Sequence, residues 1–208
     1  MSIPMPQSRR PTPKHKYRVI YADPPWPTGQ KGGRGASRHY DLMSLRDIEG
    51  MGTAIKHVAA VNSALFLWTT SNDLPNAFKV MEAWGYRYIT TFIWDKRPVM
   101  ALGAYFRGAH EVMLFGVHGK VPFNFHGQRS IETFKRREHS RKPDEIFPLI
   151  ERLLPGPALE VFGRRFPMNE DGVTRRPGWS VWGNEVASDI SLLPFGYPVP
   201  SDFDEQEP

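Results

Sequence analysis

The sequence predicts an α/β fold with a largely parallel β-sheet. Short apolar runs of strand length alternate with stretches in which apolar residues recur at helical spacing. One of these runs ends at Asp23, and another ends in a segment that contains Arg164. Because parallel sheets bind ligands beyond the carboxyl ends of their strands, both residues are candidates for a binding site. With 208 residues and 40% hydrophobic content, the chain is long enough for one domain with a real core.

Strands are expected at six apolar runs: residues 18–22, 64–68, 88–94, 112–117, 158–162 and 179–182. The first run stops at two prolines, which cannot donate to a sheet ladder, so this strand ends in a loop.

Helices are expected between several of these strands. Ser44, with Asp47 three residues later, forms a capping-box pattern that opens a short helix. Residues 74–84 place apolar side chains at helical spacing, with Ser71 or Asn72 as the N-cap.

Residues 143–145 begin a further helix, since proline needs no donor there and acidic side chains suit the positive end of the helix dipole. Pro148 is expected to bend this helix. The chain then divides into a disordered basic arm (residues 1–16), one domain (residues 17–186) and an irregular acidic tail (residues 187–208).

Composition excludes several classes of protein. Cysteine is absent and the seven histidines show no metal-ligand spacing, so we expect neither disulfides nor a metal site. No run approaches the roughly 18 apolar residues that a membrane span needs. The polar N-terminal residues lack the apolar core of a signal peptide, and a cytoplasmic location is expected.

The net charge of +5 is unevenly distributed along the chain. Basic side chains gather within residues 31–39, 135–142 and 164–176. Such clusters suit the phosphate groups of a nucleic acid, although charge alone leaves a solvated surface as the alternative. Arg38 and Arg141 are candidate contacts to that partner.

The most informative segment, residues 23–26, reads Asp23, Pro24, Pro25 and Trp26, and is called the DPPW segment below. Its prolines fix their own backbone and push each preceding residue towards extended geometry. Carbonyl oxygens are thus held rigidly beside a carboxylate, and a planar aromatic follows. A plain strand and turn with Trp26 in the core is the alternative.

Further blocks occur in order at residues 21–26, 40–44, 65–70, 84–86, 93–96, 109–111, 140–145, 159–164, 178–179 and 182–185. Together they resemble the family of the eukaryotic messenger-RNA adenosine methyltransferase catalytic subunit and its stand-alone bacterial and phage relatives. The resemblance covers roughly residues 17–186.

This resemblance implies a Rossmann-like methyltransferase fold with the permuted, beta-class order of motifs. It implies S-adenosylmethionine as the cofactor, with residues 160–164 in place of a glycine-rich loop. Lys142 would meet the cofactor's carboxylate, a task that suits an ammonium group. The other cofactor-binding residues implied are Asp23, Glu160, Phe162, Arg164, Asn184 and Glu185.

The implied reaction methylates the exocyclic amino nitrogen of adenine. That nitrogen is a poor nucleophile because its lone pair is delocalised into the ring. Asp23 and the carbonyl of Pro24 would accept its two hydrogens, and Pro25 would keep the segment rigid. Trp26 would stack on a base taken out of its helix, and Tyr40 with the loop at residues 27–39 would border the base pocket.

Four features depart from the family pattern or stay ambiguous. Asp95 stands where the family usually has an apolar residue. Residues 165–177 are longer than the usual connection, and one wall of the cofactor's adenine pocket has no assigned residue. Glu111 is interpreted as a paired acid that supports the loops, with a place in the site wall as the alternative. Trp84 and Trp94 are expected in the core.

DNA is the substrate expected, because the resemblance is to the stand-alone bacterial and phage members of the family. The sequence leaves alternatives to adenine methylation of DNA open. They are methylation of RNA, methylation of the cytosine amino group, and a non-catalytic nucleic-acid-binding subunit. No stretch is long enough for a target-recognition domain, so short or relaxed specificity, or help from a partner subunit, is expected; a homodimer is the other assembly considered. Residues 97–110 and 120–142 are expected to face the DNA.

Overall fold

The computed structural model describes residues 16–27, 42–97, 105–137, 141–172 and 174–192. Its elements are β1 (Tyr17–Ala22), α1 (Leu45–Gly50), α2 (Gly52–Val58), β2 (Ala59–Thr69), α3 (Leu74–Ala83), β3 (Arg87–Asp95), β4 (His110–His118), β5 (Ile131–Thr133), α4 (Ile146–Leu153), β6 (Ala158–Val161) and β7 (Trp179–Trp182).

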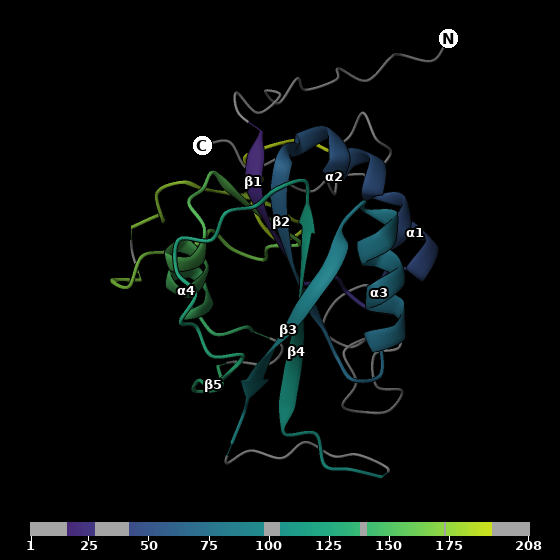
Figure 1. Cartoon of the computed structure of the whole chain (residues 1–208), viewed down its shortest axis with the longest axis vertical. Helices are drawn as coiled ribbons and strands as arrows, with labels where there is room; N and C mark the ends of the chain where they lie inside the picture. Colours follow the sequence, from purple (N-terminus) through teal and green to yellow (C-terminus); the bar gives the residue numbers. More distant parts are fainter. Residues whose placement is uncertain (1–15, 28–41, 98–104, 138–140, 173, 193–208) are drawn as a thin grey trace.

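The strands form one sheet in the order β5-β3-β4-β2-β1-β6-β7. Helices α1, α2 and α3 cover one face, and α4 covers the other (Figure 1). This arrangement confirms the predicted α/β fold.

The sheet is parallel at four of its pairings, β1–β2, β1–β6, β6–β7 and β3–β5, and antiparallel where β4 meets β2 and β3. The connection from β3 leads straight into its neighbour β4, and such a direct connection reverses the chain direction. The prediction of a largely parallel sheet is therefore confirmed, with β4 as the exception.

Strand β1 lies in the middle of the sheet and is buried on both faces. Ile20 and Ala22 belong to the core beneath α1, α2 and α3, whereas Val19 and Tyr21 belong to the core beneath α4. This two-sided burial explains why the strand reads as a continuous apolar run. It also fixes the direction in which the residues after Ala22 leave the sheet.

The helices begin and end close to the predicted positions. The side chain of Ser44 accepts a hydrogen bond from the backbone N–H of Asp47 at 3.1 Å, which confirms the predicted cap of α1. Asp73 is the N-cap of α3, where Ser71 or Asn72 had been expected. Pro148 lies in the first turn of α4, where the backbone N–H groups have no acceptor within the helix. Proline at this position therefore costs the helix no hydrogen bond.

Helix α2 and strand β5 had not been predicted; the first is seven residues long and the second three. Core packing continues past the predicted domain boundary at residue 186, because Ile190 and Leu192 are 3% and 0% exposed. Most of the predicted N-terminal arm and the end of the tail lie outside the described residues. Within the described residues, no helix has the length and apolar content to cross a membrane.

Candidate active site

The candidate site forms where the carboxyl ends of β1 and β6 lie side by side. Their parallel register pairs Ala22 with Val161, so the residues that follow both strands leave the sheet at the same edge. Asp23 follows β1, and Phe162 and Arg164 follow β6. Strand β1 lies between β6 and β2, and the chain continues from β1 to β2. In α/β sheets, ligands bind beyond the carboxyl ends of the strands at the point where the strand order reverses, and β1 lies at such a point.

The DPPW segment leaves β1 as a tight turn. The backbone N–H of Trp26 donates to the carbonyl oxygen of Pro24 at 2.9 Å, and that of Met43 donates to the carbonyl oxygen of Pro25 at 3.0 Å. The Pro24 carbonyl therefore already accepts one hydrogen bond within the turn. A carbonyl oxygen has a second lone pair, so it keeps the capacity for one more hydrogen bond.

Trp26 does not present its ring as the predicted stacking surface. Its side chain is 6% exposed and belongs to the core, and its indole N–H donates to the carbonyl oxygen of Trp68 at 3.0 Å. Burial of the ring and its N–H together anchors the DPPW segment to β2. The stacking role is thus corrected to a supporting one, and Trp84 and Trp94, at 1% and 2% exposed, are core residues as predicted.

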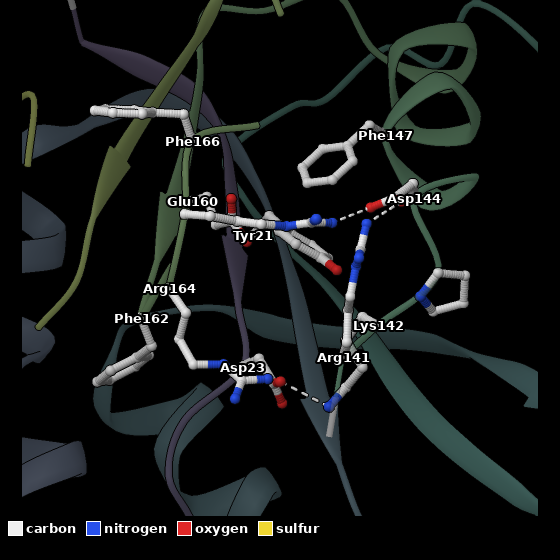
Figure 2. A pocket seen from close by; sticks show the side chains of 12 residues that line it. Tyr21, Asp23, Arg141, Lys142, Asp144, Phe147, Glu160, Phe162, Arg164 and Phe166 are labelled. Carbon is white, nitrogen blue, oxygen red and sulfur yellow. Dashed lines mark hydrogen bonds and ion pairs between the residues drawn. The ribbon is translucent and has the colours of Figure 1, made fainter. Parts of the chain in front are cut away.

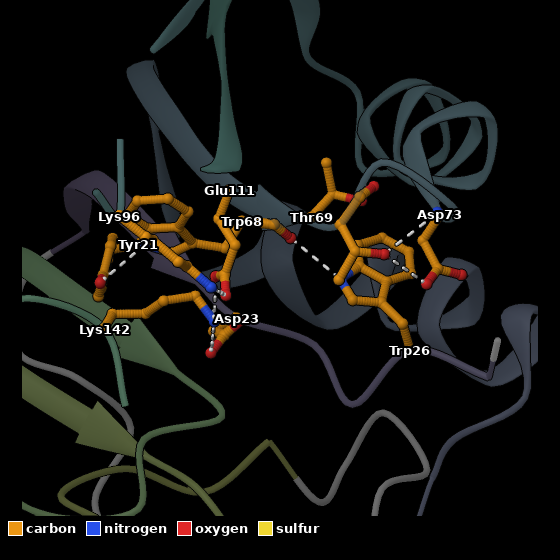
Figure 3. A network of polar contacts seen from close by, with 10 residues as sticks. Tyr21, Asp23, Trp26, Trp68, Thr69, Asp73, Lys96, Glu111 and Lys142 are labelled. Carbon is orange, nitrogen blue, oxygen red and sulfur yellow. Dashed lines mark hydrogen bonds and ion pairs between the residues drawn. The ribbon is translucent and has the colours of Figure 1, made fainter. Parts of the chain in front are cut away.

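A chain of alternating charges connects Asp23 to the start of the β3–β4 connection (Figure 3). Lys142 Nζ lies 2.6 Å from Asp23 Oδ2 and 3.2 Å from Glu111 Oε2. Glu111 in turn pairs with Lys96. Lys142 also lies over the ring of Trp68, 5.6 Å from its centroid. The cation and both carboxylates are mostly buried, so none of them has bulk water as its main partner.

These contacts shift the pKa values in the chain. Burial alone would lower the pKa of Lys142, but the carboxylates of Asp23 and Glu111 outweigh it and raise that pKa. Burial of Glu111 is likewise outweighed by Lys142 and Lys96, so the pKa of its carboxyl is lowered. Glu111 is therefore a paired acid, as interpreted from the sequence, and it supports Lys142, which contacts Asp23. Its alternative place in the site wall is not borne out, because Glu111 is not among the residues that line the cavity beside Asp23.

A cavity of about 300 Å³ opens beside Asp23 (Figure 2). It brings together five residues predicted to bind cofactor, Asp23, Lys142, Glu160, Phe162 and Arg164, and the predicted substrate contact Arg141. The structure thus unites segments that are up to 141 residues apart in the chain, which is what the predicted site requires. Arg141 donates to Asp144 at 2.6 Å, so it is held at the cavity by an ion pair.

Glu160 contributes a partly buried carboxyl to the wall of this cavity. Burial raises the pKa of its carboxyl to about 8, and the nearby Arg165 offsets only part of that effect. Within the described part of the chain, no hydrogen bond or ion pair to this carboxylate is found. The side chain is partly exposed to the cavity, so its carboxyl can accept hydrogen bonds from a ligand with hydroxyl groups at this position.

The turn after β6 has the backbone strain that often marks a binding site. Phe162 adopts φ 67, in the left-handed region that side-chain-bearing residues rarely occupy. The next residue, Gly163, donates to the carbonyl of Trp182 at 3.0 Å, and a Cβ on Gly183 would collide with the Gly163 backbone. Glycine at both positions lets the ends of β6 and β7 approach closely and leaves Phe162 at the cavity wall.

Residues 165–177, whose role the sequence did not reveal, supply part of the cavity wall. Arg165 and Phe166 line the cavity, and Arg165 forms an ion pair with Asp144 across from it. Arg175 holds this wall in place, because its guanidinium stacks 3.8 Å from the ring centroid of Phe166 and pairs with Asp189 at 2.6 Å. The unusual length of this stretch was the one sequence signal for such a wall.

The remaining predicted site residues lie elsewhere. Asn184 and Glu185 are exposed after β7 and do not line the cavity. Their assignment to cofactor binding therefore stays a prediction. Arg38, Tyr40 and most of the loop at residues 27–39 lie outside the described residues.

Comparison with known proteins identifies the family to which the chain belongs. The family model described as MT-A70 matches residues 17–185. The chain is 29% identical to the type II methyltransferase M.MunI of Mycoplasma sp over 205 residues, which covers 88% of this chain and 83% of that protein. It is 31% identical to the N(6)-adenosine-methyltransferase catalytic subunit METTL3 of Homo sapiens over 180 residues, or 82% of this chain.

That match spans 28% of the human protein, and a match to the putative N(6)-adenosine-methyltransferase MT-A70-like protein of Medicago truncatula spans 27% of its length at 26% identity. The chain thus spans about a quarter of the length of these eukaryotic relatives. Since the MT-A70 model covers nearly the whole described domain, including the DPPW segment and the cavity, the chain belongs to the MT-A70 family of methyltransferases.

Proposed function

We propose that this protein transfers a methyl group from S-adenosylmethionine to the exocyclic amino nitrogen of adenine in DNA. The observation that carries the proposal is the position of Asp23. Its carboxylate lies at the carboxyl end of β1, beside the Pro24 carbonyl and on the wall of the 300 Å³ cavity. The two proposed hydrogen-bond acceptors, the Asp23 carboxylate and the Pro24 carbonyl, therefore adjoin the candidate cofactor pocket. Methylation of an amino group needs the acceptors and the methyl donor side by side.

DNA is proposed as the substrate because of how the relatives align. M.MunI, named as a type II methyltransferase, matches over 83% of its own length. The eukaryotic N(6)-adenosine-methyltransferases match over about a quarter of theirs. The relative that aligns over most of its own length is thus the type II methyltransferase, so DNA is the proposed substrate and RNA is the substrate to test against it.

Methyltransferases of the MT-A70 family use S-adenosylmethionine, whose sulfonium supplies an electrophilic methyl group when bound. The residues of the cavity fit such a molecule. The partly buried carboxyl of Glu160 suits a ribose diol, and the ring of Phe162 suits the face of a nucleoside. Lys142 offers a cation to an amino-acid carboxylate.

The chain's own groups would then act mainly by orientation. Asp23 accepts a hydrogen bond from one amino hydrogen of adenine, and the free lone pair of the Pro24 carbonyl accepts the other. These acceptors draw the nitrogen towards tetrahedral geometry and make its lone pair available for attack on the methyl carbon. As the new N–C bond forms and the S–C bond breaks, Asp23 takes the proton that the nitrogen loses.

Identification of the methylated nucleoside tests this proposal. The purified chain is incubated with methyl-labelled S-adenosylmethionine and with DNA or RNA of matched sequence, each with and without adenine, and the digested product is identified by mass spectrometry. N6-methyldeoxyadenosine in DNA is the expected result. Label in RNA alone, or on cytosine, would contradict the substrate, and cofactor binding without label in any nucleic acid would contradict catalysis by the chain alone.

A second prediction concerns Glu160 and cofactor binding. With a pKa of about 8, this carboxyl is mostly protonated in the free protein near neutral pH. Hydroxyl donors from the cofactor would stabilise the ionised form, so binding at pH 7 should release up to about one proton per site. Affinity should accordingly rise as the pH rises towards 8, and proton release should fade above that pH, where the free carboxyl is already ionised.

Calorimetry with S-adenosylhomocysteine in buffers of different ionisation enthalpy measures this proton release. The Glu160→Gln variant should bind without releasing the proton, whereas Glu82→Gln, which changes an exposed carboxylate on α3, should behave as the unmodified chain does. Equal proton release by Glu160→Gln and the unmodified chain would exclude Glu160 as the source.

A further inference from the structure

The β3–β4 connection carries two large aromatic side chains that the described protein leaves uncovered. Tyr105 is 96% exposed and Phe106 is 91% exposed. The other exposed aromatic rings, those of Phe78, Tyr88 and Phe125, are between 38% and 41% exposed and each contacts another side chain. Two adjacent rings in water are unfavourable unless a partner covers them, so this pair calls for an explanation.

The two ends of this connection are held firmly. The backbone N–H of Lys96 donates to the carbonyl of Ala109 at 2.8 Å, and Lys96 Nζ lies 4.8 Å from the ring centroid of Trp94. The N–H of Arg97 donates to Asp95 Oδ1 at 3.0 Å. Asp95, the departure from the family pattern, therefore helps to fix where the connection leaves β3.

These anchors place the aromatic pair at the edge of the sheet that carries the candidate site. Asp95 pairs with His110 across β3 and β4, at the same edge where β2 ends and where Asp23 follows β1. The connection emerges at the end of the molecule opposite α2 (Figure 1). Lys96 is also the outer member of the charge chain that passes through Glu111 and Lys142 to Asp23 (Figure 3).

The charge around the pair favours a polyanion. Arg97, Arg107 and His110 are exposed, and the side chain of Arg97 is 72% exposed. Residues 105–110 contain no acidic residue. On these two strands Asp95 is paired with Arg97, and Glu111 with the two lysines of the charge chain, so Arg107 carries the additional positive charge next to the aromatic pair. An apolar protein partner would not need this basic surrounding, whereas nucleic acid offers both bases and phosphates.

We propose that Tyr105 and Phe106 form a stacking platform for unpaired bases of the nucleic-acid substrate, with Arg97 and Arg107 on its phosphates. This proposal rests on the proposed function, because removing a base from its helix leaves flanking bases without a stacking neighbour. Aromatic rings stabilise such bases with little regard to sequence. The platform would thus support binding without reading the base sequence.

Fluorescence anisotropy with a labelled single-stranded oligonucleotide tests the platform without cofactor or methyl transfer. The double variant Tyr105→Ala/Phe106→Ala should bind at least about tenfold more weakly than the unmodified 208-residue chain. Tyr88→Ala, which removes a half-exposed ring from the other end of β3, is the matched control and should leave the affinity unchanged. An abasic oligonucleotide of equal length should erase the difference between the chain and the double variant, since it keeps the phosphates but offers no base.

Equal affinities of the double variant and the unmodified chain would overturn the platform, as would an unmodified chain that binds no oligonucleotide. Loss of self-association in the double variant, seen by sedimentation velocity with oligonucleotide affinity unchanged, would overturn it too and assign the pair to a protein interface. A chain that binds through this pair but methylates nothing would contradict the proposed function alone.

Discussion

Replacing Asp23 with asparagine is expected to lower the rate of methyl transfer by about 100- to 1,000-fold. The carboxamide keeps the size of the side chain but loses the charge that accepts the amino hydrogen and then its proton. Lys142 retains Glu111 at 3.2 Å, so the cation is not left alone in a buried position. Steady-state assays at saturating DNA, with S-adenosylhomocysteine affinity measured separately, distinguish loss of catalysis from loss of binding.

Glu82→Gln is the control for this variant, because it removes a carboxylate from the exposed face of α3. It should retain the unmodified rate. The Asp23→Asn variant should keep the thermal unfolding profile within a few degrees, since its neighbours can still form hydrogen bonds. A normal rate in a folded Asp23→Asn protein would remove Asp23 from the proposed mechanism.

Replacing Lys142 with methionine is expected to affect both activity and stability. The change leaves the carboxylates of Asp23 and Glu111 together without the cation that lies between them. Breaking a largely buried ion pair by removing one partner costs about 3 kcal/mol. Methyl transfer should fall by at least about 100-fold, because Asp23 loses the contact that fixes its position. Denaturant unfolding and the methylation assay measure the two effects.

The stability loss in Lys142→Met should depend on pH in a defined direction. In the unmodified chain Lys142 and Lys96 lower the pKa of Glu111. The ionised Glu111 carboxylate therefore stabilises the folded state above the pKa of the unfolded chain, and this stabilisation is lost as the pH falls through the folded-state pKa. Without Lys142, repulsion and burial raise the carboxyl pKa values, so the two charges destabilise the folded state at neutral pH. The difference between variant and unmodified chain should therefore shrink as the pH falls towards about 4.

Lys142→Arg serves as the comparison, since it keeps the positive charge between the two carboxylates. It should recover most of the stability that Lys142→Met loses. A stability difference between Lys142→Met and the unmodified chain that is constant from neutral to acidic pH would show that the charge chain is not its source.

The secondary structure was predictable wherever one local pattern decided the outcome. The buried strand β1 reads as an apolar run, and the run at residues 179–182 coincides with β7. The Ser44 cap could be predicted because its hydrogen bond spans three residues. Strand β5 and the reversed direction of β4 could not, because pairing with distant strands decides both.

The site residues were predictable as a set but not in their arrangement. The resemblance between Asp23, Lys142, Glu160 and the family motif selected residues that do line one cavity. It could not show that Lys142 is held between Asp23 and Glu111, since that contact joins three separate segments. Nor could it show that Trp26 is buried: an aromatic residue has the same sequence signal in a core and on a binding surface.

The sequence by itself therefore determined the family, the chemical types of the site residues and most of the strands, because each depends on residues that are neighbours in the chain. Only the tertiary structure decided which charges neutralise one another, that Arg165 and Phe166 complete the cavity wall, and that Tyr105 and Phe106 stay uncovered. The physical reason is that burial and charge pairing depend on distances between segments, and the packing of the whole sheet fixes those distances.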